Sequence, residues 1–151
     1  MMVTWQWKTF SELSTRSLYQ VLQLRQKVFV IEQQCLYLDI DGLDSVSYHL
    51  LGLDKDEKLI AYLRVVEPTR KYAEPSIGRV VTCASCRGRG LGKQLLQQGL
   101  IETRAQFPNQ NVRLSAQQYL SDFYHKFGFQ TVSKPYLEDG IPHIEMLRKH
   151  N

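Results

Sequence analysis

The 151-residue sequence contains no long hydrophobic run and only three cysteines. No stretch approaches the roughly 18 consecutive apolar residues that a membrane-spanning helix needs, so we expect no membrane segment. The first residues, MMVTWQWKTF, lack both a basic region and a continuous apolar region. We therefore expect no signal peptide and a cytoplasmic protein. An odd number of cysteines argues against a disulfide framework and fits a reducing compartment.

Other absences bear on domain organisation. The sequence has no low-complexity run, no linker rich in Pro, Gly or Ser, and no internal repeat. Its length is enough for one domain with a substantial core, so we expect a single domain over residues 1–151. The net charge of +4 favours an anionic partner, but it does not separate nucleic acid from phosphorylated metabolites.

The apolar patterns that are present predict alternating strands and helices. Patterns typical of strands occur at residues 3–7, 48–53, 59–67, 76–82, 112–116, 129–132 and 144–147. Apolar residues at helical spacing occur at residues 14–29, 91–105 and 122–127. The order β, α, β, β, β, α, β, α, β, β indicates a mixed α/β layer architecture, with helices packed on a twisted sheet.

A glycine-rich basic loop precedes the second predicted helix, within the stretch TCASCRGRGLGKQLL (residues 82–96). Glycines let the backbone approach a ligand closely, and the first amides of a helix are unpaired hydrogen-bond donors. The helix dipole and the side chains of Arg87, Arg89 and Lys93 add positive potential. The loop therefore fits a phosphate or pyrophosphate group, whereas the alternative is a flexible connection with solvated basic residues.

Three familiar sites do not fit this stretch. A Walker A loop requires Gly at the position of Arg87 and Ser or Thr at the position of Gln94. The dinucleotide pattern G-x-G-x-x-G has Lys93 or Leu95 at its third glycine. The C-x-x-C pair lacks the further ligands of a structural zinc site, and glycines and arginines separate it from the helix. We therefore expect no metal site and no redox role.

The loop resembles the acyl-CoA loop of GNAT-family N-acyltransferases. The run Arg87-x-x-Gly90-x-Gly92 is similar to the family motif R/Q-x-x-G-x-G/A, and FYHKFGF (residues 123–129) resembles the family segment Y-x-x-x-G-F. Similarity to the ElaA subfamily extends over LRQKVFVIEQQC (24–35), DIDGLD (39–44) and YLEDGIPHIEM (136–146). The resemblance covers nearly the whole chain. It implies the GNAT fold, an α/β (α+β) structure in which about four helices flank a mixed twisted sheet of about six to seven strands, with a splayed pair at the cofactor site.

The resemblance also implies an activity and a set of residues. It implies direct transfer of an acetyl group from acetyl-CoA to a primary amine, with no covalent enzyme intermediate and no metal. Because the thiolate of CoA leaves in such a reaction, a proton donor is needed, and the resemblance gives that role to Tyr124. A buried tyrosine with a merely satisfied hydroxyl is the alternative. The resemblance assigns cofactor binding to Val80, Val81, Thr82, Arg87, Gly88, Arg89, Gly90, Leu91, Gly92, Lys93, Gln117, Phe123 and Tyr124.

The proton acceptor and the amine substrate stay open. Several relatives place a glutamate on the strand that leads into the loop, but strand 76–82 has none and Glu74 lies before it. Glu32 and His143 fall in the ElaA-like segments and His49 follows the second of them, and all three are candidates to line the acceptor pocket. The amine is a small molecule or a peptide, because specificity depends on loops that the shared motif does not constrain.

The acidic segment DIDGLD does not match a calcium loop. An EF-hand needs a glycine at its sixth position and a glutamate at its twelfth, whereas Gly42 is fourth and Leu50 is twelfth. Attraction of a cationic amine is the remaining functional interpretation of these carboxylates.

Two other functions would use the same loop. A non-catalytic acyl-CoA-binding module or sensor would keep the loop without a working acceptor pocket. A nucleic-acid binder would use the RGRG run, but RNA-binding segments of that type are long and disordered, whereas this run leads into a patterned helix. We therefore expect no nucleic-acid partner and no membrane partner. Dimers are common among such folds, so a homodimer stays open.

Overall fold

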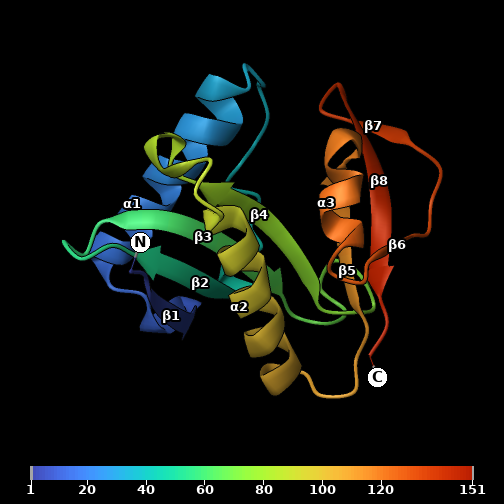
Figure 1. The fold of residues 1–151 in the computed structure, drawn as a ribbon, viewed down its shortest axis with the longest axis horizontal. Helices are drawn as coiled ribbons and strands as arrows, with labels where there is room; N and C mark the ends of the chain where they lie inside the picture. Colours follow the sequence, from blue (N-terminus) through green and yellow to red (C-terminus); the bar gives the residue numbers. More distant parts are fainter. Residues whose placement is uncertain (1, 151) are drawn as a thin grey trace.

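Eight strands form one mixed sheet in the computed structural model, which describes residues 2–150 (Figure 1). The strand order is β1-β2-β3-β4-β5-β8-β6, and β7 pairs with β8. The strands are β1 (Thr4–Thr9), β2 (Ser47–Leu53), β3 (Leu59–Val66), β4 (Ser76–Thr82), β5 (Val112–Gln117), β6 (Gln130–Thr131), β7 (Tyr136–Glu138) and β8 (Ile141–Arg148). The α-helices are α1 (Thr15–Arg25), α2 (Leu91–Gln106) and α3 (Ser121–His125).

A π-helical segment continues α1 over Gln26–Glu32. The helix begins after Ser14, whose side chain accepts a hydrogen bond from the Ser17 amide and so satisfies one unpaired donor of the first turn. Beyond the π-helical segment, Gln34 adopts a left-handed backbone conformation with φ of 51°. Wide helical turns of this kind are rare and occur mainly at functional sites, so this end of the helix is a candidate binding element.

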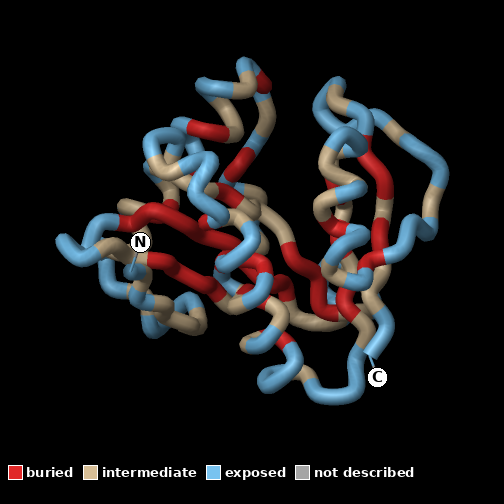
Figure 2. Tube along the Cα trace, viewed as in Figure 1, coloured by how far each residue is buried: buried red, intermediate tan, exposed pale blue. Residues whose placement is uncertain are grey.

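The core lies on both faces of the sheet. Figure 2 shows buried residues concentrated along the central strands. On one face Leu95 and Leu96 of α2 pack against side chains of β3 and β5, and on the other Val21 of α1 packs against β2 and β3. Gly99 lets α2 approach the sheet, because a Cβ atom there would lie 2.7 Å from a methyl carbon of Leu63. Burial of each such leucine stabilises the fold by about 1.5–3 kcal/mol.

The central strands β4 and β5 separate along their length. They run parallel and pair only at Ser76 with Arg113 and at Ile77 with Leu114. Beyond these pairs, residues 78–82 and 115–117 diverge, as Figure 1 shows. Backbone groups at a splayed position can pair with an extended ligand as an added strand would. The structure confirms the splayed pair that the resemblance implies.

A bulge in β4 accompanies this separation. The register between β3 and β4 shifts between Tyr62 and Arg64, and opposite this shift Arg79 has a φ of 52°. A residue other than glycine in this conformation costs roughly 1–2 kcal/mol, so side-chain contacts must hold it. The bulge bends β4 away from β5.

One detail differs from the sequence-based prediction. The sheet has eight strands in the described residues, because the three-residue strand β7 pairs with β8. Three residues are too few for an alternating pattern to be recognised. In the described residues, four short 3-10 helices accompany the three α-helices and the π-helical segment, which together match the expected number of about four helices. Within residues 2–150, none of the helices has the length and apolar character that crossing a membrane requires.

Candidate functional site

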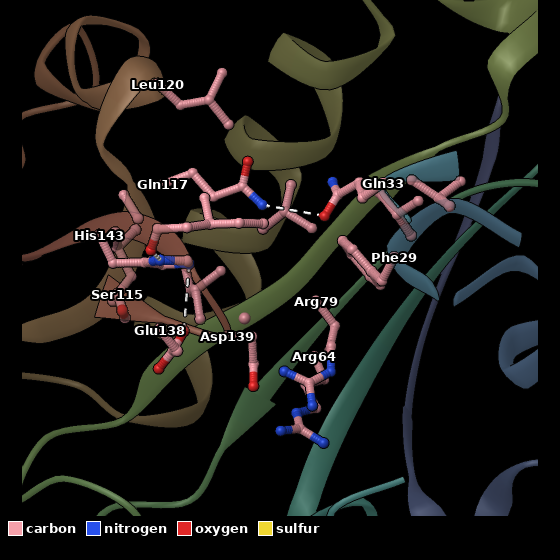
Figure 3. Close-up of a pocket in the computed structure, with 18 of the residues that line it drawn as sticks. Phe29, Gln33, Arg64, Arg79, Ser115, Gln117, Leu120, Glu138, Asp139 and His143 are labelled. Atoms are coloured by element: carbon pink, nitrogen blue, oxygen red, sulfur yellow. Dashed lines mark hydrogen bonds and ion pairs between the residues drawn. The ribbon is translucent and has the colours of Figure 1, made fainter. Parts of the chain in front are cut away.

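A cleft of about 830 Å³ opens where β4 and β5 separate. Residues 78–82 of β4 form one wall, and residues 115–117 of β5 form the other. Further lining side chains come from the end of the π-helical segment, from α3 and from the β7–β8 hairpin, and they include Phe29, Gln33, Tyr124, Glu138 and His143. Figure 3 shows Gln117 and His143 on one side of this space and Phe29 and Gln33 on the other.

The glycine-rich loop joins this cleft at the start of α2. Gly88 and Gly90 have φ values of 82° and 75°, which a residue with a side chain rarely adopts. Gly90 caps the helix, and its carbonyl accepts the first helical hydrogen bond from the Gln94 amide at 3.1 Å. The amides of the first turn have no partner within the helix, so the loop presents donors at the positive end of the helix dipole.

Most of the residues expected to bind the cofactor come together here. Those that line the cleft are Val80, Val81, Thr82, Arg87, Gly92, Gln117, Phe123 and Tyr124. The others lie next to them in the loop and the first helical turn, and they are Gly88, Arg89, Gly90, Leu91 and Lys93. Leu91 is buried in the core and anchors this turn, whereas the remaining four are exposed.

Three contacts connect the two walls of the cleft through residues 32–35, which comprise the last residue of the π-helical segment and the chain just after it. Arg87 donates two hydrogen bonds to the Glu32 carboxylate, at 2.6 and 2.7 Å. Gln117 donates to the Gln33 side chain at 3.3 Å, as Figure 3 shows. The Cys35 thiol donates to the backbone carbonyl of a β7–β8 turn residue at 3.4 Å. This segment therefore spans the cleft.

The Glu32–Arg87 pair involves the arginine of the loop motif. The hydrogen bonds from Arg87 hold the pKa of Glu32 below its ordinary value, and the same bonds raise the pKa of Arg87. Both side chains are partly exposed, at 42% and 43%, so the net stabilisation of such a pair is below about 1 kcal/mol. A ligand phosphate could displace Glu32 at modest cost.

Tyr124 lies in α3 with its side chain in the cleft wall. The residue is 6% exposed, and its ring contacts those of Phe123 and Phe129 edge-on at centroid distances of 5.2 and 6.0 Å. Burial raises the pKa of its hydroxyl to about 12. Tyr124 therefore keeps its proton at neutral pH and is able to donate it.

The β7–β8 hairpin adds a polar pair to the opposite end of the cleft. The Nε2 atom of His143 lies 3.3 Å from a carboxylate oxygen of Glu138 (Figure 3). The two side chains differ in exposure, with 9% for His143 and 45% for Glu138. Sequence patterns do not identify Glu138 as a site residue, because its position on the cleft depends on the short strand β7.

The DIDGLD segment forms a neutral charge network at the edge of the cleft, which Asp41, Arg64 and Arg79 help to line. Its three aspartates pair with three arginines, and the six residues are Asp39, Asp41, Asp44, Arg25, Arg64 and Arg79. Arg79 is the bulged residue of β4, and its Nε atom lies 2.8 Å from Asp39. The network therefore holds the bulge, and we assign these carboxylates no role in attracting an amine.

His49, a candidate for the acceptor pocket, does not line the cleft. Its residue is fully buried, and its ring nitrogens lie 2.6 Å from the Tyr62 hydroxyl and 2.9 Å from the Asp44 carbonyl oxygen. Burial lowers the pKa of His49. Both nitrogens are used within the fold, so His49 is a structural residue, whereas the candidates Glu32 and His143 do line the cleft.

Comparison with known proteins relates the whole chain to one family. The model of the acetyltransferase (GNAT) domain matches residues 10–149. ElaA of Escherichia coli is 44% identical over 150 residues, which cover 98% of this chain and 97% of ElaA. A UPF0039 protein of Synechocystis is also 44% identical, over 97% of this chain and 96% of its own length. Among solved structures, an acyl-CoA N-acyltransferase of Pseudomonas aeruginosa is 43% identical with a TM-score of 0.93, covering 97% of this chain and 99% of that one.

Proposed function

Because the chain belongs to the GNAT family of acyl-CoA N-acyltransferases, we propose that it transfers the acetyl group of acetyl-CoA directly to a primary amine. One observation carries this proposal. The splay between β4 and β5 leads into the glycine-rich start of α2, and the protonated phenol of Tyr124 lies in the same cleft. The acceptor is a small-molecule or peptide amine that reaches the cleft from the side of the β7–β8 hairpin.

Residues of the cleft fit the parts of acetyl-CoA. Backbone groups of residues 78–82 are available to pair with the amides of the pantetheine arm, since β5 has diverged from them. The loop amides and Arg87 fit the pyrophosphate. Acetyl-CoA supplies an activated thioester when it is bound. Tyr124 then donates its proton to the leaving sulfur, and the cleft orients the amine and excludes water.

Calorimetric titration of acetyl-CoA into the wild-type protein tests the proposal, with ATP and dephospho-CoA as comparison ligands. We expect saturable binding of acetyl-CoA and much weaker binding of ATP. Primary amines are then screened by release of the free CoA thiol. Absence of acetyl-CoA binding at millimolar concentration would contradict the proposed function.

Gly90→Val is expected to weaken acetyl-CoA binding about tenfold or more. The residue has a φ of 75°, and a side chain in that conformation costs roughly 1–2 kcal/mol, where about 1.4 kcal/mol is tenfold in affinity. Open space surrounds the position, so no clash with the protein itself is expected. The control is the double variant Cys83→Ser and Cys86→Ser, which should bind normally. The reverse pattern in calorimetry would reject the loop as the pyrophosphate site.

Glu32→Gln is expected to increase acetyl-CoA affinity by about two- to fivefold. The substitution removes the carboxylate that competes for Arg87, and an exposed pair of this kind contributes up to about 1 kcal/mol. Calorimetry at constant salt measures the change, with Glu57→Gln, in an exposed turn, as the control. Weaker binding by Glu32→Gln would mean that Glu32 orders Arg87 for the ligand and does not compete with it.

A non-catalytic acyl-CoA-binding module is the second candidate function. It is favoured by the absence of a glutamate from β4, where several GNAT enzymes place the residue that receives the proton of the amine. Such a module would bind acetyl-CoA but release no thiol with any amine. The amine screen that follows the acetyl-CoA titration therefore distinguishes the two functions.

A further inference from the structure

We propose that Glu138 and His143 together form the base that receives the proton of the amine. This inference rests on the proposed function and names the group that β4 lacks. The pair reaches the cleft from β7 and β8, and both side chains line it. The base therefore comes from a different part of the sheet than in relatives with a glutamate on the strand before the loop.

Hydrogen bonding fixes the proton on the His143 ring. The Nδ1 atom lies 2.7 Å from the Ile141 carbonyl oxygen, which can only accept, so Nδ1 carries a hydrogen and donates it. In the neutral ring Nε2 then presents a lone pair to the Glu138 carboxylate, 3.3 Å away. The Nε2 lone pair and the carboxylate oxygen are both hydrogen-bond acceptors, so a proton between them would bond to both. The geometry therefore suits the uptake of one proton.

The position of the pair suits attack on a thioester in the splay. His143 is the antiparallel neighbour of Gln117, the β5 residue at the open end of the splay. The ring stacks on Tyr136 at a centroid distance of 6.2 Å, and the Tyr136 hydroxyl bonds to Ser115 in the cleft wall. This packing holds the imidazole in place. Glu138 is half exposed, so the proton can afterwards pass to water.

The other charged and titratable groups around the pair come from the loop after β3, from β5, from β7 and from β8. They are Lys71, Tyr72, Arg113, Tyr136 and Glu145, together with Asp139 of the β7–β8 turn. Burial lowers the pKa of Lys71, and the charge of Glu138 opposes this effect. Arg113 engages Glu145 at 2.9 Å and Glu74 at 2.9 Å, so these two carboxylates already have cationic partners. Burial raises the pKa of Tyr136, which keeps its proton at neutral pH. Glu138 is thus the carboxylate that lies next to the histidine, at 3.3 Å, with Lys71 as a further charged neighbour.

The proposed step balances as follows. The nitrogen lone pair of the amine forms a bond to the acetyl carbon, and the bond between that carbon and sulfur breaks. Before the attack, the ammonium form of the amine gives one proton to the space between His143 Nε2 and Glu138, and this proton then passes to water. The leaving sulfur takes a proton from Tyr124, and the second proton, which the nitrogen loses as the amide forms, restores Tyr124 through water exchange.

The test compares two amines with opposite needs for a base. At pH 8.5 benzylamine is still mostly protonated, whereas hydrazine, the weaker base, is mostly unprotonated. General-base catalysis typically contributes on the order of 10²-fold, so Glu138→Gln and His143→Asn should each lower kcat/KM for benzylamine by about 10- to 100-fold. With hydrazine we expect a change below about threefold. In the wild type, kcat/KM for benzylamine should rise with pH and reach a plateau. In both variants it should rise without a plateau, because the remaining rate depends on the concentration of unprotonated amine in solution.

Two controls separate a catalytic role from a structural one. Acetyl-CoA affinity, measured by calorimetry, should be unchanged in both variants, and Glu57→Gln should leave both amine reactions unchanged. Equal losses with benzylamine and hydrazine would overturn the assignment. In nitrogen NMR, Glu138→Gln should change the Nε2 signal of His143 while Nδ1 keeps its hydrogen. An unchanged Nε2 signal would contradict the interaction between His143 and Glu138, even if no amine reacts. If the wild type releases no thiol with either amine, that result counts against the proposed function instead.

Discussion

Tyr124→Phe is expected to lower kcat by on the order of 10²-fold or more while acetyl-CoA binds almost as tightly as to the wild type. The hydroxyl is the only group that the substitution removes, and the ring keeps its edge-on contacts with Phe123 and Phe129. A CoA thiolate that leaves without a proton donor is a poor leaving group. Burial of Tyr124, which raises the pKa of its hydroxyl to about 12, keeps the proton available across the neutral range.

The measurement is steady-state release of the CoA thiol with saturating acetyl-CoA and one amine, together with calorimetric affinity for acetyl-CoA. Tyr19→Phe is the matched control, since Tyr19 is 70% exposed on α1, away from the cleft. A variant with unchanged kcat would exclude Tyr124 as the acid. A variant with unchanged kcat but weaker acetyl-CoA binding would give the hydroxyl a binding role only.

The cofactor side of the site could be predicted from sequence because its determinants are contiguous. The run from Arg87 to Gly92 carries its own signal, since glycines at positive φ and the start of a helix act within one short segment. The strands on either side show ordinary apolar patterns. Local sequence therefore predicts both the loop and the elements that it joins.

Other features of the cleft depend on contacts between residues that are distant in the sequence. Glu32 and Arg87 are 55 residues apart, and Gln33 and Gln117 are 84 apart, so no spacing in the sequence indicates that they meet. Glu138 reaches the cleft only because a three-residue strand pairs with β8.

The two histidines also show that the sequence alone does not tell which side chains reach the cleft. His49 and His143 both lie in or close to family-like segments, yet His49 is enclosed between Tyr62 and Asp44 while His143 lines the cleft. Strand register and bulges determine which face of the sheet a side chain lies on. They also determine which neighbouring groups already bond to its polar atoms. Those features arise from packing of the whole sheet and are weakly encoded in a single strand.

The acidic side chains of DIDGLD show that a sequence pattern can also suggest a ligand site where the fold uses the residues structurally. Their sequence suggests ligand binding, but the fold uses all three to neutralise arginines that are 0%, 1% and 17% exposed in their side chains. Placing a guanidinium in the protein interior without a counter-charge is very unfavourable. The segment is thus a structural requirement for Arg79 and the β4 bulge, and through the bulge for the splay that makes the cleft.

Asp44→Asn is therefore expected to reduce the free energy of unfolding by about 3 kcal/mol or more at pH 7. Asp44 accepts hydrogen bonds from Arg25 at 2.7 Å and from Arg64 at 3.0 Å, and asparagine leaves these buried cations short of one negative charge. Urea unfolding at pH 7 measures the loss. The control is Glu67→Gln, which removes an exposed pair with Arg70 and should change stability by less than about 1 kcal/mol. A loss below about 1 kcal/mol for Asp44→Asn would show that the network can rearrange.

The same network predicts how stability depends on pH. Burial raises the pKa of Asp44, but the hydrogen bond from Arg25 and the charges of Arg25 and Arg64 outweigh it and hold that pKa below its ordinary value of 3.8. A carboxyl with a lowered pKa in the folded state stabilises the protein above its ordinary pKa, and this stabilisation is lost as the pH falls further.

His49 acts in the same direction at higher pH, because burial lowers its pKa below 6.5 and the unfolded chain then binds the additional proton. Acidification should therefore destabilise the wild type in two stages, first below about pH 6.5 and then below about pH 4, and Asp44→Asn should reduce the second stage while the first remains.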